Sequence, residues 1–389
     1  MKQAAVIGAL AVCAFGCRTL SLSSDALAPP ADEHLQIPSY FDVEWWTPLV
    51  KPPLLDYQPS ETASPAVDPD TERVVVCTRD GMVRSLSPID GHIEWEKTIR
   101  GRCFAGATIY EGVVYVPGGD SVLYALRART GEELWQYPAG EELVTAPLVA
   151  GDLLLVASQS EALFAVDRQT GKWKWQYRRD PPSGFTVRGT ANPVVNGDRV
   201  YMGFADGYVV ALGLADGQQK WERNLSTSGG LQFLDADATP VLDDSGTLYA
   251  ASYKDGVAAM NAETGELQWA TARPGVVSML RSGEVLLTGG DNRVAALHTG
   301  TGRELWSLDL AKGLNKKTAS GRPPVLLRGL LVVPTSGALV FIDPLKGRAK
   351  VAWNPGKGIT ASPTVYGGRM YIMSNLGTVF ALTLRTGGS

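Results

Sequence analysis

The chain has 389 residues, and its 36 Lys and Arg against 40 Asp and Glu leave a net charge of −4. This near balance excludes the basic stripe that nucleic-acid binding requires, while 44% hydrophobic and 20% charged residues are typical of a folded globular protein. Three His and four Cys do not form the clusters that bind zinc, so we expect no metal site. The 43 glycines and 10 tryptophans favour short strands joined by tight turns.

The N-terminus has the pattern of a processing signal. Lys2 precedes an apolar run over 4–15, which is too short to span a bilayer and has the length of a signal-peptide core. Cys17 follows small residues, an arrangement similar to a bacterial lipobox, in which the cysteine is lipidated and becomes residue one. An ordinary cleaved signal with an incidental Cys17 is the alternative. We predict a signal peptide over 1–16 and a palmitate-type anchor on Cys17 at the start of a polar tether over 17–40.

One repeat covers most of the remaining chain. An apolar residue recurs five positions before a Gly, and a Trp recurs four positions after it. The pairs are Gly91 with Trp95, Gly131 with Trp135, Gly171 with Trp175, Gly217 with Trp221, Gly265 with Trp269 and Gly302 with Trp306, then Gly347 with Trp353 two positions late, and finally Gly387 alone. The intervals between glycines are 40, 40, 46, 48, 37, 45 and 40. A period near 40 indicates a repeat array or a propeller.

Each repeat contains four predicted strands. Segments such as 122–126 and 207–212 are rich in β-branched and aromatic residues, and the Gly provides the positive φ of a hairpin turn. The last repeat ends one strand short, whereas 43–48 looks like an isolated fourth strand with Trp45 or Trp46 as its docking residue. We therefore predict an all-β, eight-bladed β-propeller over 41–389, whose last blade is closed by the N-terminal strand and whose Trp side chains pack between blades.

The repeat resembles the tryptophan-docking motif of PQQ-type eight-bladed propellers. Enzymes of that group bind pyrroloquinoline quinone and Ca²⁺, and typically carry a disulfide between adjacent cysteines. Here Cys77 and Cys103 are not adjacent, and no acidic residue stands in a constellation with His, Ser or Cys. We expect no catalytic residues, no cofactor and no small-molecule substrate. Both cysteines can be buried thiols or form a disulfide in an oxidising periplasm.

Two stretches carry a closer resemblance, to the BamB family of the outer-membrane β-barrel assembly machinery. Residues 181–189 (PPSGFTVRG) resemble the family's Ser-Leu-Ser-Leu-Arg-Gly motif, with Phe185, Val187 and Arg188 at the two apolar positions and the Arg. Residues 234–240 (LDADATP) are similar to its Asp-x-Asp-x-Thr-Pro motif, with Asp235 and Asp237 as the acids. The resemblance implies that these five residues bind the BamA subunit.

The spacing of the repeats supports one binding face. Both stretches lie in the longest intervals, each between the last strand of one blade and the first strand of the next. Such connectors emerge on one face, so neighbouring loops should lie side by side. The alternative is that Arg188 only pairs with Asp235 or Asp237 and ties the loops together. A third connector, 309–321, contains Lys312, Lys316 and Lys317 and reads as a solvated basic loop, or as a contact for an acidic partner or a lipid head group.

Together these features predict a non-catalytic scaffold lipoprotein of outer-membrane protein assembly. The residue after Cys17 is Arg rather than Asp, which by the bacterial sorting rule implies the outer membrane of a Gram-negative cell, with the propeller in the periplasm. The expected partner is a BamA-like barrel protein with POTRA domains, and the role is to assist insertion of outer-membrane proteins. The alternatives are a PQQ-dependent quinoprotein-like enzyme, or a PQQ-like propeller lipoprotein that binds another envelope partner.

Overall fold

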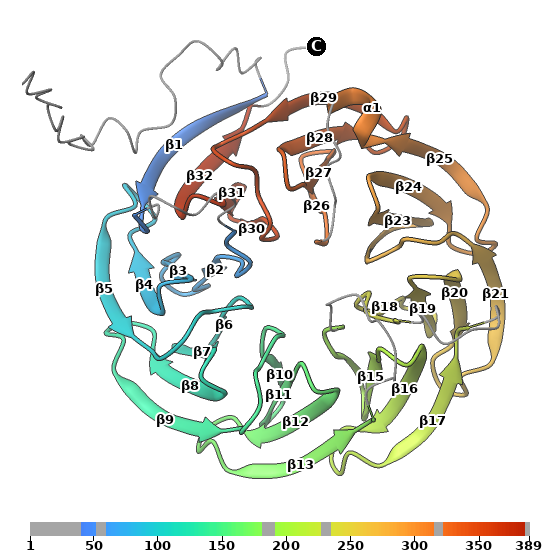
Figure 1. Cartoon of the computed structure of the whole chain (residues 1–389), viewed down its shortest axis with the longest axis horizontal. Helices are drawn as coiled ribbons and strands as arrows, with labels where there is room; N and C mark the ends of the chain where they lie inside the picture. The colour runs from blue at the N-terminus through green and yellow to red at the C-terminus, as the bar shows by residue number, and fades with distance from the viewer. Residues whose placement is uncertain (1–39, 52–59, 181–190, 227–234, 315–321, 386–389) are drawn as a thin grey trace, which may run out of the picture.

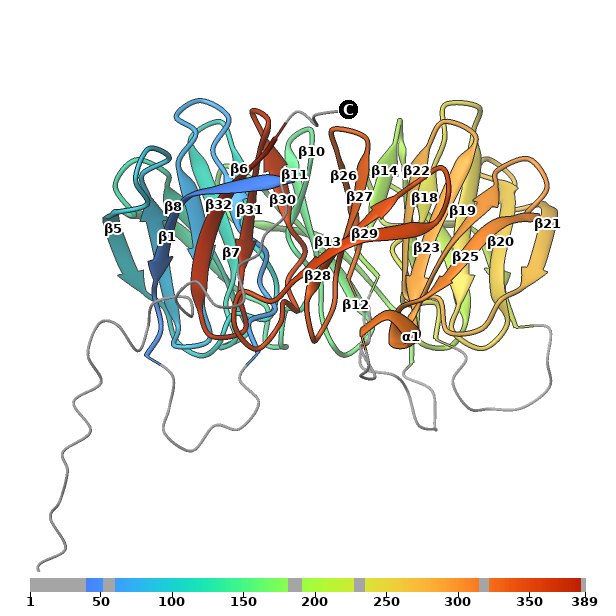
Figure 2. The same ribbon diagram turned by 90° about the horizontal axis from the view of Figure 1, so that it is seen from above.

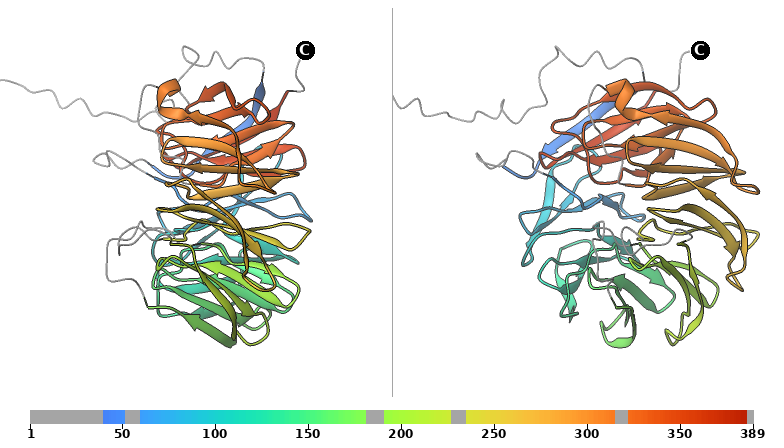
Figure 3. Two further views of the ribbon diagram at one scale, coloured as in Figure 1. Left: turned by 90° about the vertical axis from the view of Figure 1, so that its right-hand side faces the viewer. Right: turned by 45° about the vertical axis from the view of Figure 1, so that its right-hand side comes forward.

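Eight antiparallel sheets of four strands stand in a ring (Figure 1). The computed structural model describes residues 40–51, 60–180, 191–226, 235–314 and 322–385. The ring is a flattened disc in side view (Figure 3), and the strands of each blade run from one face of the disc to the other. An eight-bladed all-β propeller was predicted, and the structure confirms it.

The blades are numbered from the N-terminus, and each strand order runs from the centre of the ring outward. Blade 1 contains β2 (Ala66–Val67), β3 (Val74–Cys77), β4 (Met82–Leu86) and β5 (Ile93–Thr98). Blade 2 contains β6 (Thr108–Tyr110), β7 (Val113–Pro117), β8 (Val122–Arg127) and β9 (Glu133–Pro138). Blade 3 contains β10 (Leu148–Ala150), β11 (Leu153–Ala157), β12 (Ala162–Asp167) and β13 (Trp173–Arg178). Blade 4 contains β14 (Val194–Asn196), β15 (Arg199–Gly203), β16 (Tyr208–Gly213) and β17 (Gln219–Asn224).

The second half of the ring repeats this arrangement. Blade 5 contains β18 (Val241–Leu242), β19 (Thr247–Ser252), β20 (Gly256–Asn261) and β21 (Leu267–Ala272). Blade 6 contains β22 (Ser278–Ser282), β23 (Val285–Gly290), β24 (Arg293–His298) and β25 (Glu304–Asp309), followed by the short helix α1 (Leu310–Leu314). Blade 7 contains β26 (Val325–Leu327), β27 (Leu330–Pro334), β28 (Leu339–Asp343) and β29 (Arg348–Trp353). Blade 8 contains β30 (Thr364–Tyr366), β31 (Arg369–Met373), β32 (Thr378–Leu384) and β1 (Phe41–Pro48).

Burial follows the position of a strand in its blade. The second and third strands are buried on both sides by neighbouring blades, as in β11 and β12, and consist mainly of Leu, Val, Ala and Phe. The fourth strands alternate between exposed and partly buried side chains, as in β9. This pattern reflects a core that lies between the blades and is divided into eight clusters around the ring.

The tryptophans join each blade to the next. At seven interfaces the indole Nε1 donates to a main-chain carbonyl in the next blade, three residues before that blade's repeat Gly. The donor and acceptor pairs are Trp45 with Pro88, Trp95 with Ala128, Trp135 with Arg168, Trp175 with Leu214, Trp221 with Ala262, Trp269 with Thr299 and Trp306 with Pro344. The predicted packing of Trp side chains between blades is thereby confirmed.

The indole ring of each docking Trp also lies flat on the repeat Gly of the next blade. A Cβ atom at Gly91, for example, would stand 2.3 Å from Cε3 of Trp45, and the same contact recurs at the other six interfaces. The glycine is therefore needed for space as well as for its positive φ of 72°. Because Trp45 makes these contacts, it is the docking residue of the N-terminal strand, whereas Trp46 packs on the cluster between blades 7 and 8.

The late tryptophan of blade 7 serves a different contact. Trp353 packs against Phe41 of β1 and Phe380 of β32, with ring centroids 5.1 and 5.3 Å away. Val351 occupies the position four residues after Gly347, where other blades have the docking Trp. The interface between blades 7 and 8 is thus an aromatic cluster, which accounts for the shift of two residues.

Strand β1 closes the ring. It pairs antiparallel with β32 from Phe41 opposite Leu384 to Pro48 opposite Thr378. Ion pairs between Asp42 and Arg385 and between Glu44 and Arg369 hold it at the edge of blade 8. The predicted closure by the N-terminal strand is confirmed, with the strand beginning two residues earlier than expected.

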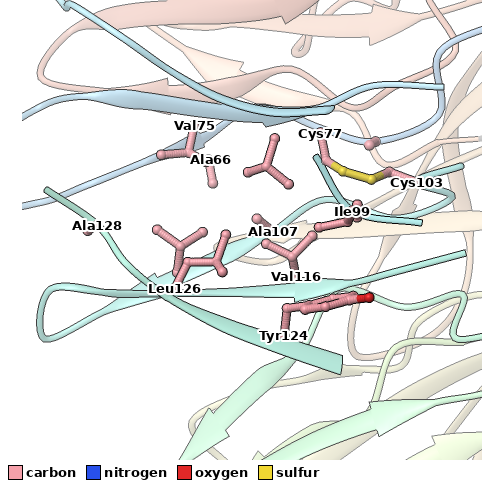
Figure 4. Close-up of a cluster of buried hydrophobic side chains, with 13 residues drawn as sticks. Ala66, Val75, Cys77, Ile99, Cys103, Ala107, Val116, Tyr124, Leu126 and Ala128 are labelled. Atoms are coloured by element: carbon pink, nitrogen blue, oxygen red, sulfur yellow. A yellow bond between two sulfur atoms is a disulfide. The ribbon is translucent and has the colours of Figure 1, made fainter. Parts of the chain in front are cut away.

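Cys77 and Cys103 form a disulfide (Figure 4). Cys77 ends β3, and Cys103 lies in the connector from β5 to β6, with 5.7 Å between the Cα atoms. Both residues are buried in the cluster between blades 1 and 2. The sequence was compatible with two buried thiols or with a disulfide, and the structure contains the disulfide.

The two faces of the disc differ in their loops. We call the lower face the one that carries the connectors between blades, the turns between second and third strands, and α1 (Figure 2). The upper face carries the turns between third and fourth strands, the start of β1 and the end of β32. Each blade is a meander, so this division of loops follows from the strand order alone.

Candidate partner-binding face

The two predicted binding stretches fall on connectors of the lower face. The first lies between β13 and β14, which joins blades 3 and 4, and the second between β17 and β18, which joins blades 4 and 5. Phe185, Val187 and Arg188 lie outside the described residues, as does Cys17. Asp235 and Asp237 are described, and they show how the second connector sits on blade 4.

A hydrogen-bonded pair links the two connectors. The main-chain N–H and the side-chain Nδ2 of Asn192 both donate to Oγ1 of Thr239, each at 3.1 Å. Asn192 comes three residues after the end of the first stretch, and Thr239 follows Asp237 by two residues. The two connectors therefore meet at the ends that enter β14 and β18, whereas residues 181–190 and 227–234 lie outside the described residues.

Arg179 fixes the other end of the first connector. Its guanidinium donates to Asp206 at 2.6 Å and to Glu222 at 2.7 Å, and it lies 4.5 Å above the ring of Tyr208. All three partners belong to blade 4, whereas Arg179 follows the last strand of blade 3. Charge-assisted hydrogen bonds and the aromatic contact therefore fix the point from which residues 181–190 start.

Asp235 is buried rather than exposed to a partner. Its relative exposure is 1%, and its main-chain carbonyl accepts from the N–H of Tyr253 at 2.8 Å. The next residue, Ala236, donates its N–H to the carbonyl of Phe204 in blade 4. Asp235 is thus part of the floor on which the second connector rests, which the sequence did not indicate.

Asp237 is partly buried next to it. Both carboxylate oxygens are inaccessible to water and accept no hydrogen bond from the described residues. Burial, together with the nearby negative charges of Asp235 and Glu161, raises the pKa of Asp237 to about 9. A carboxylate in this position is best stabilised by a cation brought to it.

Glu161 completes a group of buried acids. It lies in the turn between β11 and β12, is 5% exposed, and accepts a hydrogen bond from the N–H of Ala205 at 2.9 Å. Burial raises the pKa of Glu161 to about 7, and Asp206 and Asp235 act in the same direction, while the Ala205 N–H and Arg179 oppose them. Blades 3, 4 and 5 therefore meet around carboxyl groups under the predicted binding loops.

The sequence contained a signal for Glu161 that its motifs did not reveal. In the same turn, blades 1, 4 and 8 have Gly81, Gly207 and Gly377, and blades 2 and 6 have Ser121 and Asn292, all with positive φ; Glu161 is the acid among these residues. Glu161 has a φ of 60°, a backbone conformation that costs a non-glycine residue about 1 kcal/mol. An acid at a glycine position of a repeat is kept against a local energetic cost, and the repeats can be compared to find it.

The third connector is less informative. Residues 310–314 form α1, and the side chain of Lys312 is 86% exposed, 3.9 Å from Asp309. Lys316 and Lys317 fall outside the described residues. The described part of this connector agrees with a solvated basic loop.

The described ranges show neither a metal cluster nor a membrane helix. No group of three or more His, Cys, Asp or Glu among the described residues has the geometry to hold a metal ion. The only described helix, α1, is too short to cross a bilayer.

Comparison with known proteins identifies the family. The family model described as outer membrane protein assembly factor BamB matches residues 79–290 and 290–389. The BamB of Shewanella oneidensis is 30% identical over 73% of this chain and 72% of its own length. The chain belongs to the BamB family. The BamB of Escherichia coli K12 is 27% identical over 80% of this chain and 82% of its own length.

Solved structures match the fold. BamB from Moraxella catarrhalis has a TM-score of 0.74 at 23% identity, over 88% of this chain and 99% of that chain. The quinohemoprotein alcohol dehydrogenase from Comamonas testosteroni has a TM-score of 0.69 at 14% identity, over 90% of this chain and 77% of that chain. At these identities both likenesses show the propeller alone. Curated relatives named as assembly factors, not enzymes, carry the family assignment.

Proposed function

We propose that this protein is a non-catalytic scaffold lipoprotein of outer-membrane protein assembly, whose lower face binds a BamA-type subunit. Membership of the BamB family supports the process, because its members are named outer membrane protein assembly factors. The hydrogen-bonded pair of Asn192 and Thr239 is the observation that carries the site, since it joins the two connectors that resemble the family's binding motifs.

The proposed contact has an apolar centre and a charged border. Phe185 and Val187 would bury against the partner, and Arg188 would donate charge-assisted hydrogen bonds to it. Asp237 would accept a partner's Lys or Arg, which offsets the unfavourable burial of its carboxylate. Asp235 supports the second connector from below and is not expected to touch the partner. Binding of this kind would bring the barrel protein and its substrates together without chemistry.

The location follows from the proposed anchor. Cys17 would carry the lipid after removal of residues 1–16, and residues 17–40 would connect it to β1. Several acyl chains on one residue, each CH₂ adding about 0.8 kcal/mol, are enough for stable attachment. The relatives' names place the process at the outer membrane, so the propeller would stand in the periplasm. The disulfide agrees with that oxidising compartment.

The test is binding to the purified POTRA domains of the BamA subunit from the same organism. Arg188→Ala is expected to weaken binding by about 2 kcal/mol, or roughly 30-fold, because such residues dominate interface energies. Asp237→Ala should weaken it as well. Circular dichroism should show that both variants keep the fold.

Arg178→Ala is the matched control. Arg178 lies three residues before the first stretch, but its guanidinium pairs with Glu141 and donates to the carbonyl of Ser160. It should leave the affinity within about threefold, as expected for an exposed ion pair. If folded Arg188→Ala binds the POTRA domains like the parent, the binding face lies elsewhere on the ring.

A further inference from the structure

Two bulky apolar side chains stand in solvent on the upper face. Ile89 is 83% exposed and Leu345 is 85% exposed, the highest values among the large hydrophobic residues that the structure describes. Single exposed apolar residues are ordinary on protein surfaces. These two differ because they occupy the same position of the repeat, two residues before Gly91 and Gly347.

The other repeats lack a large apolar residue at this position. The equivalent residues of blades 2 to 6 are Arg129, Gln169, Ala215, Glu263 and Gly300. A polar or small residue is what an exposed hairpin turn normally carries. The bulky side chains of blades 1 and 7 are thus exceptions within one molecule, where fold and turn type are held constant.

Both turns are held rigidly. Pro88 and Pro344 precede the two residues, and their carbonyls accept the indole N–H of Trp45 and Trp306 at 3.0 and 2.8 Å. The fixed φ of proline and the bond to the neighbouring blade restrict each turn. The side chains of Ile89 and Leu345 are therefore presented to solvent and do not fold back onto the ring.

The two turns lie on either side of the blade at which the N-terminal strand enters the ring. Blades 1 and 7 are the two neighbours of blade 8 (Figure 1), and β1 begins and β32 ends at the upper face of blade 8 (Figure 2). The chain toward Cys17 therefore leaves the ring between the two apolar turns. Cys17 and Tyr40 are 23 positions apart, a span of at most about 80 Å when fully extended. A tether of that length keeps the ring near a membrane but does not orient it.

The charges beside Leu345 also suit a lipid surface. Lys346 and Arg348 follow it and are exposed. Basic residues near a bilayer are attracted by anionic head groups. The turn of blade 1 differs, because the residue after Ile89 is the acid Asp90, which pairs with His92; the attraction to head groups therefore comes from blade 7.

We propose that Ile89 and Leu345 insert into the lipid bilayer on either side of the anchored chain and fix the orientation of the propeller. The pair forms a second and third point of membrane contact, in addition to the lipid on Cys17. Blade 8 then lies nearest the bilayer, and the lower face with its binding connectors is turned away from it. This inference rests on the proposed anchor at Cys17 but not on the identity of the partner.

The experiment uses the full-length lipidated protein in vesicles of phosphatidylethanolamine and phosphatidylglycerol. Ile89→Cys, Leu345→Cys and Ala215→Cys each receive an environment-sensitive fluorophore, since Cys77 and Cys103 are in a disulfide. Ala215 is the matched control, because it has the same turn position in blade 4, opposite blade 8. Quenching by lipids with brominated acyl chains reports insertion.

Probes at positions 89 and 345 should be quenched at least threefold more than the probe at 215. Equal quenching at all three positions overturns the proposal while leaving the anchor intact. A blue-shifted but unquenched probe also overturns it, because protein would then cover the site. Flotation of the same vesicles tests the anchor separately: protein that does not float refutes lipidation at Cys17, and the proposal with it. Binding of the POTRA domains, measured on the same samples, tests the partner independently.

Discussion

Gly171 has no side chain because Trp135 of the preceding blade lies where a Cβ atom would stand. The distance from that position to Cε3 of Trp135 is 2.5 Å, well inside van der Waals contact. The same spacing along the sequence therefore encodes both sides of an interface. Each repeat provides a Gly that contacts the indole of the preceding blade, and a Trp whose indole contacts the turn of the next blade.

The first prediction separates space from backbone conformation. Gly171→Ala should lower the free energy of unfolding by about 2–4 kcal/mol, because it adds overpacking against Trp135 to the cost of a positive φ. Gly151→Ala is the control in the same blade: its φ is 61°, close to the 68° of Gly171, but a Cβ there meets nothing within 4 Å. Urea unfolding should show a loss of only about 1 kcal/mol for the control. Equal losses would mean that the indole contact is unimportant.

The second prediction concerns Asp237 and pH. Its pKa in the folded protein is about 9, far above the usual 3.8, so between these values the native state binds a proton that the unfolded state has lost. Stability must then fall as pH rises, by up to about 1.4 kcal/mol per pH unit for one proton. Asp237→Asn removes this dependence and should be more stable than the parent at pH 8.5, but not at pH 4.

An exposed carboxylate provides the control for this prediction. Asp198→Asn changes a carboxylate that is 92% exposed and should shift stability by less than about 0.5 kcal/mol at either pH. If Asp237→Asn is less stable than the parent at pH 8.5, a cation of the same chain already neutralises Asp237. Arg188 is then the first candidate, and the connectors are tied together before any partner arrives.

At the scale of the element, β1 is the strand that the ring cannot form from consecutive sequence. It contributes Trp45 to the interface with blade 1 and Phe41 to the aromatic cluster with blade 7. Deletion of residues 41–48 should expose the edge of β32 and empty both contacts. The expected result is a large loss of stability with aggregation, measured by thermal unfolding and light scattering.

A milder variant serves as its control. Arg385→Ala removes the ion pair with Asp42 at the same edge but leaves the strand in place. Because both side chains are more than half exposed, the loss of stability should be small, and the melting temperature should stay close to that of the parent. An unchanged melting temperature after deletion of β1 would contradict the closure of the ring.

Local repeats made the fold predictable from sequence, whereas the site was predictable only in outline. The Gly and Trp positions recur at fixed spacing because each is dictated by one neighbouring blade, and the missing strand of the last repeat pointed to 43–48. The burial of Asp235 and the gathering of Asp235, Asp237 and Glu161 into one buried group could not be predicted in this way, since both depend on three blades meeting. The shift of Trp353 likewise depends on Phe41, more than 300 residues away.

At the scale of the whole molecule, the disulfide fixes the junction of blades 1 and 2. It closes a loop with a sequence separation of 26 residues, which restricts the unfolded chain and should contribute about 3 kcal/mol. The double variant Cys77→Ala with Cys103→Ala should therefore melt a few degrees lower by calorimetry. Dithiothreitol should lower the melting temperature of the parent toward that value and leave the variant unchanged. A parent and variant that melt together would show that the bond adds no stability.

The closure by β1 also sets an order of events in the life of the chain. Strand β1 is the first strand to be synthesised, yet its partner β32 is among the last; Asp42 and Arg385, which pair across this edge, are 343 residues apart. Seven blades can assemble as they appear, since their contacts are between neighbours, but the eighth must wait for both ends. A chain stalled before residue 378 therefore keeps an unpaired strand near its N-terminus, and the ring closes only after the last strand has been synthesised.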